Sequence, residues 1–369
     1  MNGSISSLID RLAAAHRLEH GEYKALIDGR TPEAAERLAA LASEARKRIY
    51  GNKIYIRGLI EISSICKNDC LYCGLRRSNR SCQRYRLDAD KILSCCREGY
   101  ALGFRTFVLQ GGEDAYFTDG RLCGLLRAIK REHPDCAVTL SFGERSRESY
   151  ERLREAGADR YLLRHETADA AHYAKLHPAS MSFENRMRCL NDLKALGYQV
   201  GCGFMVGSPR QTSETLASDL KFVEAFQPDM CGIGPFIPQS ETPFRAEKAG
   251  SLELTCYLLS ILRLIRPNLL LPATTALGSV HPFGREMAYK PAQTSLCRIC
   301  LRRRCEKNMR CTTTRSPTGT NRRSASLRSP REWPPSATRR SSTGAMSSAP
   351  IKRQSGKIRE QEIQLRERK

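Results

Sequence analysis

Three cysteines stand close together in one short segment, as Cys66, Cys70 and Cys73, with the spacing C-x3-C-x2-C. Their thiolates are soft ligands of the kind that hold iron–sulfur clusters or zinc. A [4Fe–4S] cluster bound by only three cysteines keeps one iron without a protein ligand. The segment therefore indicates redox chemistry at a cluster that is open to a small molecule.

Two other interpretations of these cysteines compete with a cluster. Structural zinc normally takes four ligands, often as paired C-x2-C units, and the sequence offers no clear fourth ligand here. Cysteines also fill apolar cores as small side chains. However, Asn68 and Gly74 flank the thiols with residues that are typical of a loop. A cluster is the better interpretation.

The open iron of such a cluster suits S-adenosylmethionine (SAM), whose amino and carboxylate groups could chelate it. One electron passed to the SAM sulfonium would release a 5′-deoxyadenosyl radical. The sequence thus predicts reductive SAM cleavage as the chemistry of this loop.

The segments that must position the cysteines alternate between two periodicities. Short β-rich runs occupy Lys53–Ser63, Phe104–Gln110, Ala137–Ser141, Arg160–Arg164, Gln199–Val206, Met230–Ile237 and Asn268–Ala273. Helical patterns occupy Asp88–Ala101, Gly120–Glu132, Ser146–Ala156, Ser182–Leu196, Thr212–Ala225 and Leu252–Ile265. This alternation predicts βαβ units and a parallel sheet.

The predicted fold class is α/β, a (β/α)8 TIM-type barrel. The seven β-rich runs would need one more strand to close into such a barrel. Polar residues and glycines follow successive strands, at the end where such folds place their sites. Residues 3–49 predict two amphipathic helices, the second capped by Thr31 with Pro32 at its first position. The predicted domains are N-terminal helices over 1–50, the barrel over 51–290 and a tail over 291–369.

Several motifs give the chain its resemblance to a known family. C-x3-C-x2-C with Tyr72 before the third cysteine resembles the radical SAM superfamily, as does the glycine-rich run Leu109–Asp114. Within it, the chain resembles the maturases of the [FeFe]-hydrogenase H-cluster over residues 5–289. The motifs behind this are Cys70–Arg77, Asp159–Thr167, Ser182–Arg186, Gly232–Pro238 and Pro272–Ala276.

The resemblance assigns roles to individual positions. The SAM cofactor would lie against Tyr72 (near the adenine), Gly111, Gly112, Glu113, Ser141, Glu166 (on the ribose hydroxyls) and Arg186 (on the carboxylate). Glu suits paired hydroxyls, and Arg suits a bidentate carboxylate. The substrate would lie against Arg57, Thr139, Arg164, Thr274 and Thr275. His165 points to the opposite face of its strand and receives no role. For each residue, a surface salt bridge or strand-end hydrogen bond is the alternative.

The resemblance also implies a small, anionic or organometallic substrate, an iron species carrying CO and cyanide, together with a partner maturase and an electron donor. Other enzymes of the superfamily, such as 3-methylornithine synthase or biotin-synthase relatives, remain alternatives. A non-catalytic, metal-containing nucleic-acid-binding protein is a further alternative. One departure from the family pattern is Arg210, which stands where the family has glycine and would cost about 1 kcal/mol if the backbone needs a positive φ.

The tail from Pro291 onward differs sharply from the rest of the chain. It holds 20 of the 61 Lys and Arg residues but only 5 of the 39 Asp and Glu, so much of the net charge of +22 lies there. Such composition predicts disorder, and the eighth strand is expected to be missing. We hypothesise that the reading frame shifts near residue 290; a nucleic-acid-binding tail is the alternative. Four tail cysteines are rejected as ligands: Cys297, Cys300, Cys305 and Cys311.

The distribution of apolar residues along the sequence indicates the cellular compartment of the protein. The opening stretch has no apolar signal-peptide core, and no apolar run approaches the ~20 residues of a membrane span. A cytoplasmic protein without membrane contact is expected, in which the 16 cysteines are reduced or bind metal. Because the excess charge lies in the tail, it does not favour nucleic acid as a partner of the folded part.

Overall fold

The structure is a computed structural model that describes residues 4–281, 284, 295–299 and 340–341. Its helices are α1 (Ile5–Ala15), α2 (His20–Asp28), α3 (Pro32–Tyr50), α4 (Ala89–Ala101), α5 (Asp119–Glu132), α6 (Arg147–Glu155), α7 (Ala170–Leu176), α8 (Phe183–Ala195), α9 (Ser213–Phe226), α10 (Leu252–Ile265) and α11 (Thr275–Val280). Its strands are β1 (Ile54–Ser63), β2 (Thr106–Gly111), β3 (Ala137–Ser141), β4 (Arg160–Leu162), β5 (Gln199–Cys202), β6 (Met205–Val206), β7 (Met230–Cys231), β8 (Gly234–Pro235), β9 (Pro272–Ala273), β10 (Ser295–Ile299) and β11 (Arg340–Ser341).

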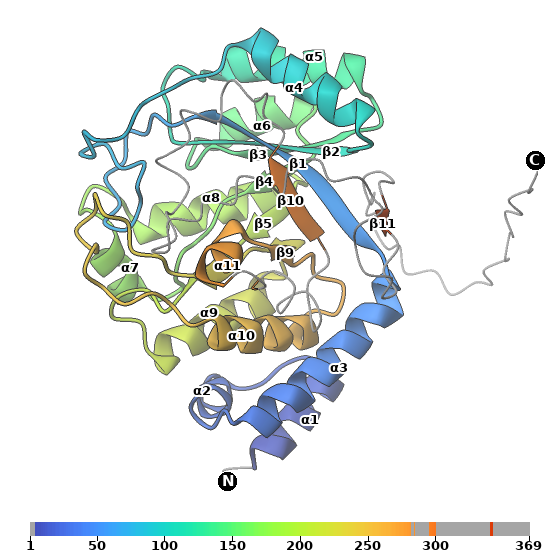
Figure 1. Cartoon of the computed structure of the whole chain (residues 1–369), viewed down its shortest axis with the longest axis vertical. Coiled ribbons are helices and arrows are strands. Elements are labelled where there is room, and N and C mark those ends of the chain that lie inside the picture. The colour runs from blue at the N-terminus through green and yellow to red at the C-terminus, as the bar shows by residue number, and fades with distance from the viewer. Residues whose placement is uncertain (1–3, 282–283, 285–294, 300–339, 342–369) are drawn as a thin grey trace, which may run out of the picture.

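Eight of these strands form a parallel barrel with helices outside it (Figure 1). Neighbouring strands pair in the order β7-β5-β4-β3-β2-β1-β10-β9. A parallel bridge between Met230 and Leu270 joins β7 to the segment that leads into β9. There, the Leu270 N–H donates to the Asp229 carbonyl at 3.0 Å, and the Cys231 N–H donates to the Leu270 carbonyl at 3.0 Å. The predicted α/β barrel fold is confirmed.

The expectation of a missing eighth strand is wrong. β10 pairs in parallel with β1 from Tyr55 to Leu59 and with β9, so it fills the gap between the first and last strands. A strand ladder uses backbone groups, and the open edges of β1 and β9 offer such groups to any short extended segment. The barrel therefore extends past residue 290. The rest of the predicted tail lies outside the described residues, apart from β11, which pairs with β1.

Alternation along the strands separates two environments. In β3, Val138 and Leu140 belong to the apolar core beneath the helices, whereas Thr139 is fully buried but lies outside that apolar cluster. Successive side chains of a strand point to opposite faces, so Thr139 faces the barrel interior. The same alternation places Tyr161 and Leu163 in the core, and it places Arg160, Leu162 and Arg164 on the opposite, interior face.

Two predicted strands are each divided in two. The run 199–206 becomes β5 and β6, and the run 230–237 becomes β7 and β8. Gly203 separates the first pair with φ +156°, and a Cβ built on it would lie 2.1 Å from the Gly232 carbonyl oxygen. Only glycine permits this approach of two backbones, so the strands bend where they pass each other.

The N-terminal region contains three helices, not the predicted two. His16 adopts a left-handed conformation with φ 58° and ends α1, which divides the first predicted helix. The predicted start of α3 is confirmed, because the Thr31 side chain accepts from the Ala34 N–H with Pro32 in the first turn. These helices lie against α9 and α10 (Figure 1), where the Tyr23 hydroxyl donates to Glu224 Oε2 at 2.7 Å.

Two short helices, α7 and α11, were not predicted, because segments of 7 and 6 residues are too short to show a helical period. Among the described residues, none of the helices is both long and apolar enough to cross a membrane.

Candidate active site

The three cysteines lie on the loop that connects β1 to α4, at the carboxyl end of the barrel strands. All three thiols are half-buried. Burial raises the pKa of Cys66 and Cys70, and it raises the pKa of Cys73 to about 11. The neighbouring Cys73 and Cys66 thiols raise the pKa of Cys70 further, because the three groups lie near one another. Metal binding here would therefore release protons.

One arginine holds the cysteine loop in shape. Arg84 Nη1 donates to the carbonyls of Ser64 at 2.5 Å and Leu75 at 2.9 Å. Arg84 Nη2 donates to the carbonyls of Arg76 at 2.6 Å and Asn79 at 3.1 Å. A single planar guanidinium thus joins the start of the loop to its far side. Sequence reasoning missed Arg84, because nothing in its local pattern distinguishes it from neighbouring arginines.

Two carboxylates complete the support of this loop. Asp69 accepts from Arg76 Nε at 2.9 Å and from the Ser78 hydroxyl at 2.5 Å, and the Arg76 contact lowers the pKa of Asp69. At the loop's start, the Ser63 hydroxyl donates to Asp114 Oδ2 at 2.6 Å and accepts from the Ile65 N–H at 3.1 Å. Asp114 therefore fixes the backbone directly before Cys66.

Three thiols on one loop are a donor set that suits an iron–sulfur cluster. Among the residues that the structure describes, no three His, Cys, Asp or Glu side chains converge closely enough to hold one metal ion. A four-iron cluster binds each thiolate to a different iron and therefore needs more widely spaced thiols. Three thiols near one another on one loop match the ligand set of a cluster that keeps one iron without a protein ligand.

The glycine-rich end of β2 packs directly against the cysteine loop. A Cβ on Gly112 would lie 2.3 Å from the Ile65 carbonyl oxygen and 2.7 Å from Cys66 Cβ. Glycine is therefore required here by the loop itself, independently of any cofactor. A Cβ on Gly111 would lie 3.2 Å from the Phe142 ring and from the Ser63 carbonyl oxygen.

Glu113 connects the β2 end to the cysteine loop and to the β3 end. Its carboxylate lies 3.2 Å from Lys67 Nζ and accepts from the Glu144 N–H at 3.1 Å. Gly143 has φ +69°, and a Cβ on it would collide with this carboxylate. Glu113 is thus fully engaged by the protein.

The side chain of Tyr72 is held by His177, which directly follows α7. The Tyr72 hydroxyl lies 3.2 Å from His177 Nε2, and the two rings meet edge-on at 5.4 Å. His177 Nδ1 lies 3.0 Å from the Tyr173 carbonyl oxygen. Because a carbonyl can only accept, Nδ1 carries the proton and Nε2 accepts from Tyr72. Burial lowers the pKa of His177 to about 4, so this imidazole is neutral.

Glu166 lies at the end of β4 in a strained conformation, with φ +66°. Left-handed backbone disfavours side chains with a Cβ, and such outliers gather at functional sites. Its Oε2 lies 3.3 Å from Arg164 Nη2, but no hydrogen bond in the described structure satisfies either atom. A buried carboxylate oxygen without a donor is suited to a ligand that brings hydroxyl groups.

A buried pair lies behind Glu166. His165 and Asp219 are both fully buried, with His165 Nε2 3.4 Å from Asp219 Oδ1. Asp219 also accepts from the Ala168 N–H at 2.6 Å, and the Gly203 N–H approaches His165 Nδ1 at 3.4 Å. As expected, His165 faces away from the barrel interior. It nevertheless anchors the turn that carries Glu166, a structural role that the sequence did not reveal.

Arg186, buried on α8, is held by a carboxylate of the chain itself. Its Nε donates to Glu144 Oε1 at 2.6 Å, and its Nη1 donates to the Arg164 carbonyl. Glu144 also accepts from Asn185 Nδ2 at 2.6 Å. These contacts fix the guanidinium and use two of its three nitrogens.

The barrel interior carries buried cations that lack carboxylate partners. Arg57 Nη1 contacts Met230 Sδ at 2.8 Å, while Arg57 Nε and the Thr139 hydroxyl have no hydrogen-bond partner among the described residues. Arg160, which was not predicted, donates from Nε to Gln199 Oε1 at 2.5 Å. Burial and the neighbouring Arg57 lower the pKa of Arg160 to about 10. Such an interior suits an anion.

The remaining predicted residues lie at strand ends with weaker engagement. Ser141 is half-buried at the end of β3. The Thr274 hydroxyl donates to the Ile233 carbonyl at 3.3 Å, whereas Thr275 begins α11 and is exposed. Arg57 and Thr139 are thus buried in the barrel interior, Arg164 is half-buried beside Glu166, and Thr275 is exposed at the start of α11. The unusual Arg210 does have φ +66°, so the backbone conformation that favours glycine is present.

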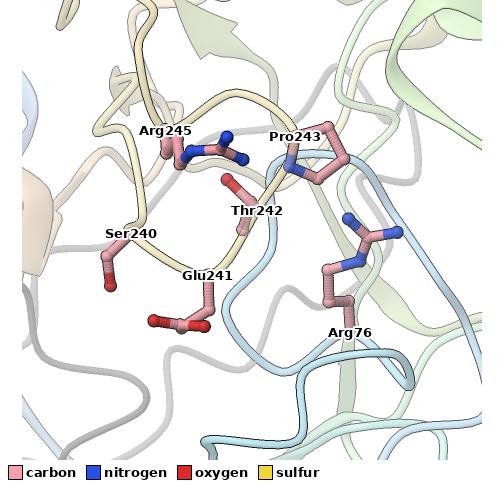
Figure 2. A pocket seen from close by; sticks show the side chains of 6 residues that line it. All are labelled: Arg76, Ser240, Glu241, Thr242, Pro243 and Arg245. Carbon is pink, nitrogen blue, oxygen red and sulfur yellow. The ribbon is translucent and has the colours of Figure 1, made fainter.

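A hollow in the surface adjoins the cysteine loop. None of the predicted site residues lines it, and Ser81 from the loop donates to Glu241 Oε2 at 3.2 Å nearby. Its lining, shown in Figure 2, consists of Arg76, Ser240, Glu241, Thr242, Pro243 and Arg245.

A parallel barrel with three neighbouring thiols on the loop after its first strand indicates the class of this protein. A family model described as the radical SAM superfamily matches residues 60–223. The chain belongs to the radical SAM superfamily, and it is an enzyme of that class. The family resemblance drawn from its sequence motifs is confirmed.

Among characterised relatives, the chain is similar to the [FeFe] hydrogenase maturase subunit HydE of Thermotoga maritima. The two are 46% identical over 255 residues, which cover 69% of this chain and 72% of HydE. It is 30% identical over 278 residues to 3-methylornithine synthase of Methanosarcina acetivorans, covering 74% of this chain and 78% of that enzyme.

Solved structures agree on the fold. Methylornithine synthase (PylB) superposes with a TM-score of 0.71 and 27% identity, covering 79% of this chain and 85% of that one. The maturase HydG from Carboxydothermus hydrogenoformans superposes with a TM-score of 0.69 over 79% of this chain and 70% of its own; at 20% identity it supports the fold alone.

Proposed function

We propose that this radical SAM enzyme holds a [4Fe–4S] cluster on Cys66, Cys70 and Cys73 and acts in maturation of the [FeFe]-hydrogenase H-cluster. The observation that supports the chemistry is the trio of half-buried, free thiols that lie near one another on the loop after β1. The observation that supports the pathway is 46% identity to HydE across more than two thirds of both chains.

The cofactor supplies a 5′-deoxyadenosyl radical when the cluster donates an electron to bound SAM. The protein's own residues position the reactants. Glu166, with a buried oxygen that lacks a donor, would hold the ribose hydroxyls, and Arg186 would use its remaining nitrogen on the SAM carboxylate. Tyr72, fixed by His177, would lie along the adenine.

The barrel interior would hold the substrate. Arg57 and Arg160 bring buried positive charge into the barrel interior, and Arg57 Nε lacks a hydrogen-bond partner in the described structure. Arg164, which the resemblance also assigns to the substrate, is half-buried and lies 3.3 Å from Glu166. Buried cations of this kind favour an anionic substrate, and a cyanide-bearing iron complex supplied by a partner maturase meets that description. An external protein would supply the electron.

A second function within the same superfamily is 3-methylornithine synthesis. The fold similarity to PylB and the 30% identity to the Methanosarcina enzyme favour it, but the sequence identity to HydE is higher. The non-catalytic nucleic-acid-binding alternative is set aside, because the chain belongs to a family of enzymes.

The chemistry is tested by anaerobic reconstitution with iron and sulfide. We expect four irons per chain, an EPR spectrum that changes on SAM addition, and 5′-deoxyadenosine as product. Cys66→Ala, Cys70→Ala and Cys73→Ala should each abolish SAM cleavage, whereas Cys123→Ala, which changes a buried free cysteine on α5, should not. One tightly bound zinc and no paramagnetic signal would refute the cluster.

The pathway is tested separately in an in vitro maturation mixture that lacks only its HydE. Adding the reconstituted chain should restore hydrogen evolution by the hydrogenase. If the chain cleaves SAM but leaves the hydrogenase inactive, the maturation role is wrong while the SAM chemistry stands.

A further inference from the structure

A buried tyrosine beside the proposed SAM site has a hydroxyl without a function in the fold. Tyr173, on α7, is 1% exposed, and its hydroxyl has no hydrogen-bond partner within the described structure. Leaving a buried hydroxyl unpaired destabilises a protein, so native structures rarely keep one without reason. A bound ligand that accepts a hydrogen bond from the Tyr173 hydroxyl would supply such a reason.

The ring of Tyr173 is held rigidly. It stacks on His177 at 3.9 Å with an interplanar angle of 21°, and it meets Phe183 edge-on at 5.6 Å. The helix that carries it starts at Asp169, whose side chain accepts from the His172 N–H at 2.6 Å. The hydroxyl therefore cannot swing to water, and its direction is set before any ligand binds.

The surroundings of the hydroxyl identify the ligand group. The Arg186 guanidinium carbon lies 5.8 Å from the centre of the Tyr173 ring. Burial raises the pKa of Tyr173; among its neighbours Arg186 affects that pKa most and lowers it, Glu144 and Cys70 raise it, and Glu166 comes last. The Tyr173 ring therefore lies beside the arginine assigned to the SAM carboxylate.

We propose that Tyr173 is a further SAM-binding residue whose hydroxyl donates a hydrogen bond to the SAM carboxylate, beside Arg186. The inference rests on the proposed SAM site. A phenol is a good donor to a carboxylate, and a bond to a charged acceptor in a dry site is stronger than a neutral one. Arg186 already donates to Glu144 and to the Arg164 carbonyl, and its free N–H groups would share the SAM carboxylate with the Tyr173 hydroxyl, so that both carboxylate oxygens gain donors.

The test compares Tyr173→Phe with the wild type, both reconstituted with the cluster. The variant keeps the stacked ring and loses only the hydroxyl. SAM affinity, measured by titrating the cluster's EPR signal, should fall about tenfold or more, as expected for one hydrogen bond to a charged group. The melting temperature of the cluster-free variant should be unchanged or higher, because an unpaired buried hydroxyl has been removed.

Tyr198→Phe is the matched control. Its hydroxyl is also buried, but it donates to the Tyr150 carbonyl at 2.6 Å. This control should lower the melting temperature and leave SAM affinity unchanged, the opposite pattern. If Tyr173→Phe also lowers stability while binding SAM normally, its role is structural and the inference is wrong.

Decarboxylated SAM identifies the contact. Tyr173→Phe should lose little affinity for this analogue, because the proposed partner is already absent. Equal losses for SAM and the analogue would refute the carboxylate contact. If SAM does not change the EPR spectrum of the wild type, the proposed function is wrong. If the wild type binds SAM and Tyr173→Phe binds it equally well, only the inference about Tyr173 is wrong.

Discussion

Replacing Arg84 should release the cysteine loop while leaving the barrel folded. The guanidinium donates four hydrogen bonds to backbone carbonyls at 2.5 to 3.1 Å, from Ser64 at the start of the loop to Asn79 near its end. No other described side chain joins these parts of the loop through four such bonds. The three thiols between them therefore depend on Arg84 for their relative positions.

The size of the effect follows from these bonds. A typical intramolecular hydrogen bond contributes about 0.5–1.5 kcal/mol net, so four contribute about 2–6 kcal/mol. Arg84 is only half-buried, and water can replace part of what is lost, so Arg84→Ala should cost about 2–3 kcal/mol of local stability. Arg84→Lys keeps the charge but lacks the planar fork, and it should recover less than half of this loss.

Two measurements check this prediction. Amide hydrogen exchange over residues 64–82 should become at least tenfold faster in Arg84→Ala, while exchange in α5 and α9 stays unchanged. Iron retained after anaerobic reconstitution should fall in the order wild type, Arg84→Lys, Arg84→Ala. Arg80→Ala, an exposed arginine of the same loop, is the control and should behave as wild type. Wild-type exchange and iron content in Arg84→Ala would refute the reasoning.

Two further predictions concern titratable groups of the site. Glu166→Gln should weaken SAM binding by about 1–3 kcal/mol without loss of iron, because the amide accepts hydrogen bonds but lacks the charge; calorimetry that finds wild-type affinity would exclude Glu166 from the cofactor site. Burial lowers the pKa of His177 from 6.5 to about 4, so between these values the unfolded chain binds a proton that the folded chain does not. Stability should therefore fall by about 3 kcal/mol as pH drops from 6.5 to 4, and His177→Asn should flatten that slope in urea titrations; an unchanged slope would show that another group is responsible.

Local pattern was sufficient for most of the strands and longer helices of the barrel and for the cysteine loop. Hydrophobic periodicity is a property of residues that are close in the sequence, so the alternation of strand and helix patterns predicted the barrel. The spacing C-x3-C-x2-C predicted the cluster loop. The eighth strand escaped prediction, because Ser295–Ile299 is short and followed by a run of arginines. Its pairing depends on two edges that come together only in the closed barrel, which sequence period cannot show.

The sequence by itself was sufficient to predict which residues would carry the chemistry, since thiols, glycines and the motif carboxylates have properties that neighbours in the chain do not change. Only the tertiary structure decided what holds them. The supporting contacts join residues that lie 5 to 105 positions apart in the chain. Arg84 binds backbone carbonyls, Asp219 lies against the buried His165 imidazole, and His177 contacts the Tyr72 phenol. A hydrogen bond depends on distance and direction in space, and folding alone brings these donors and acceptors within 3.5 Å of each other.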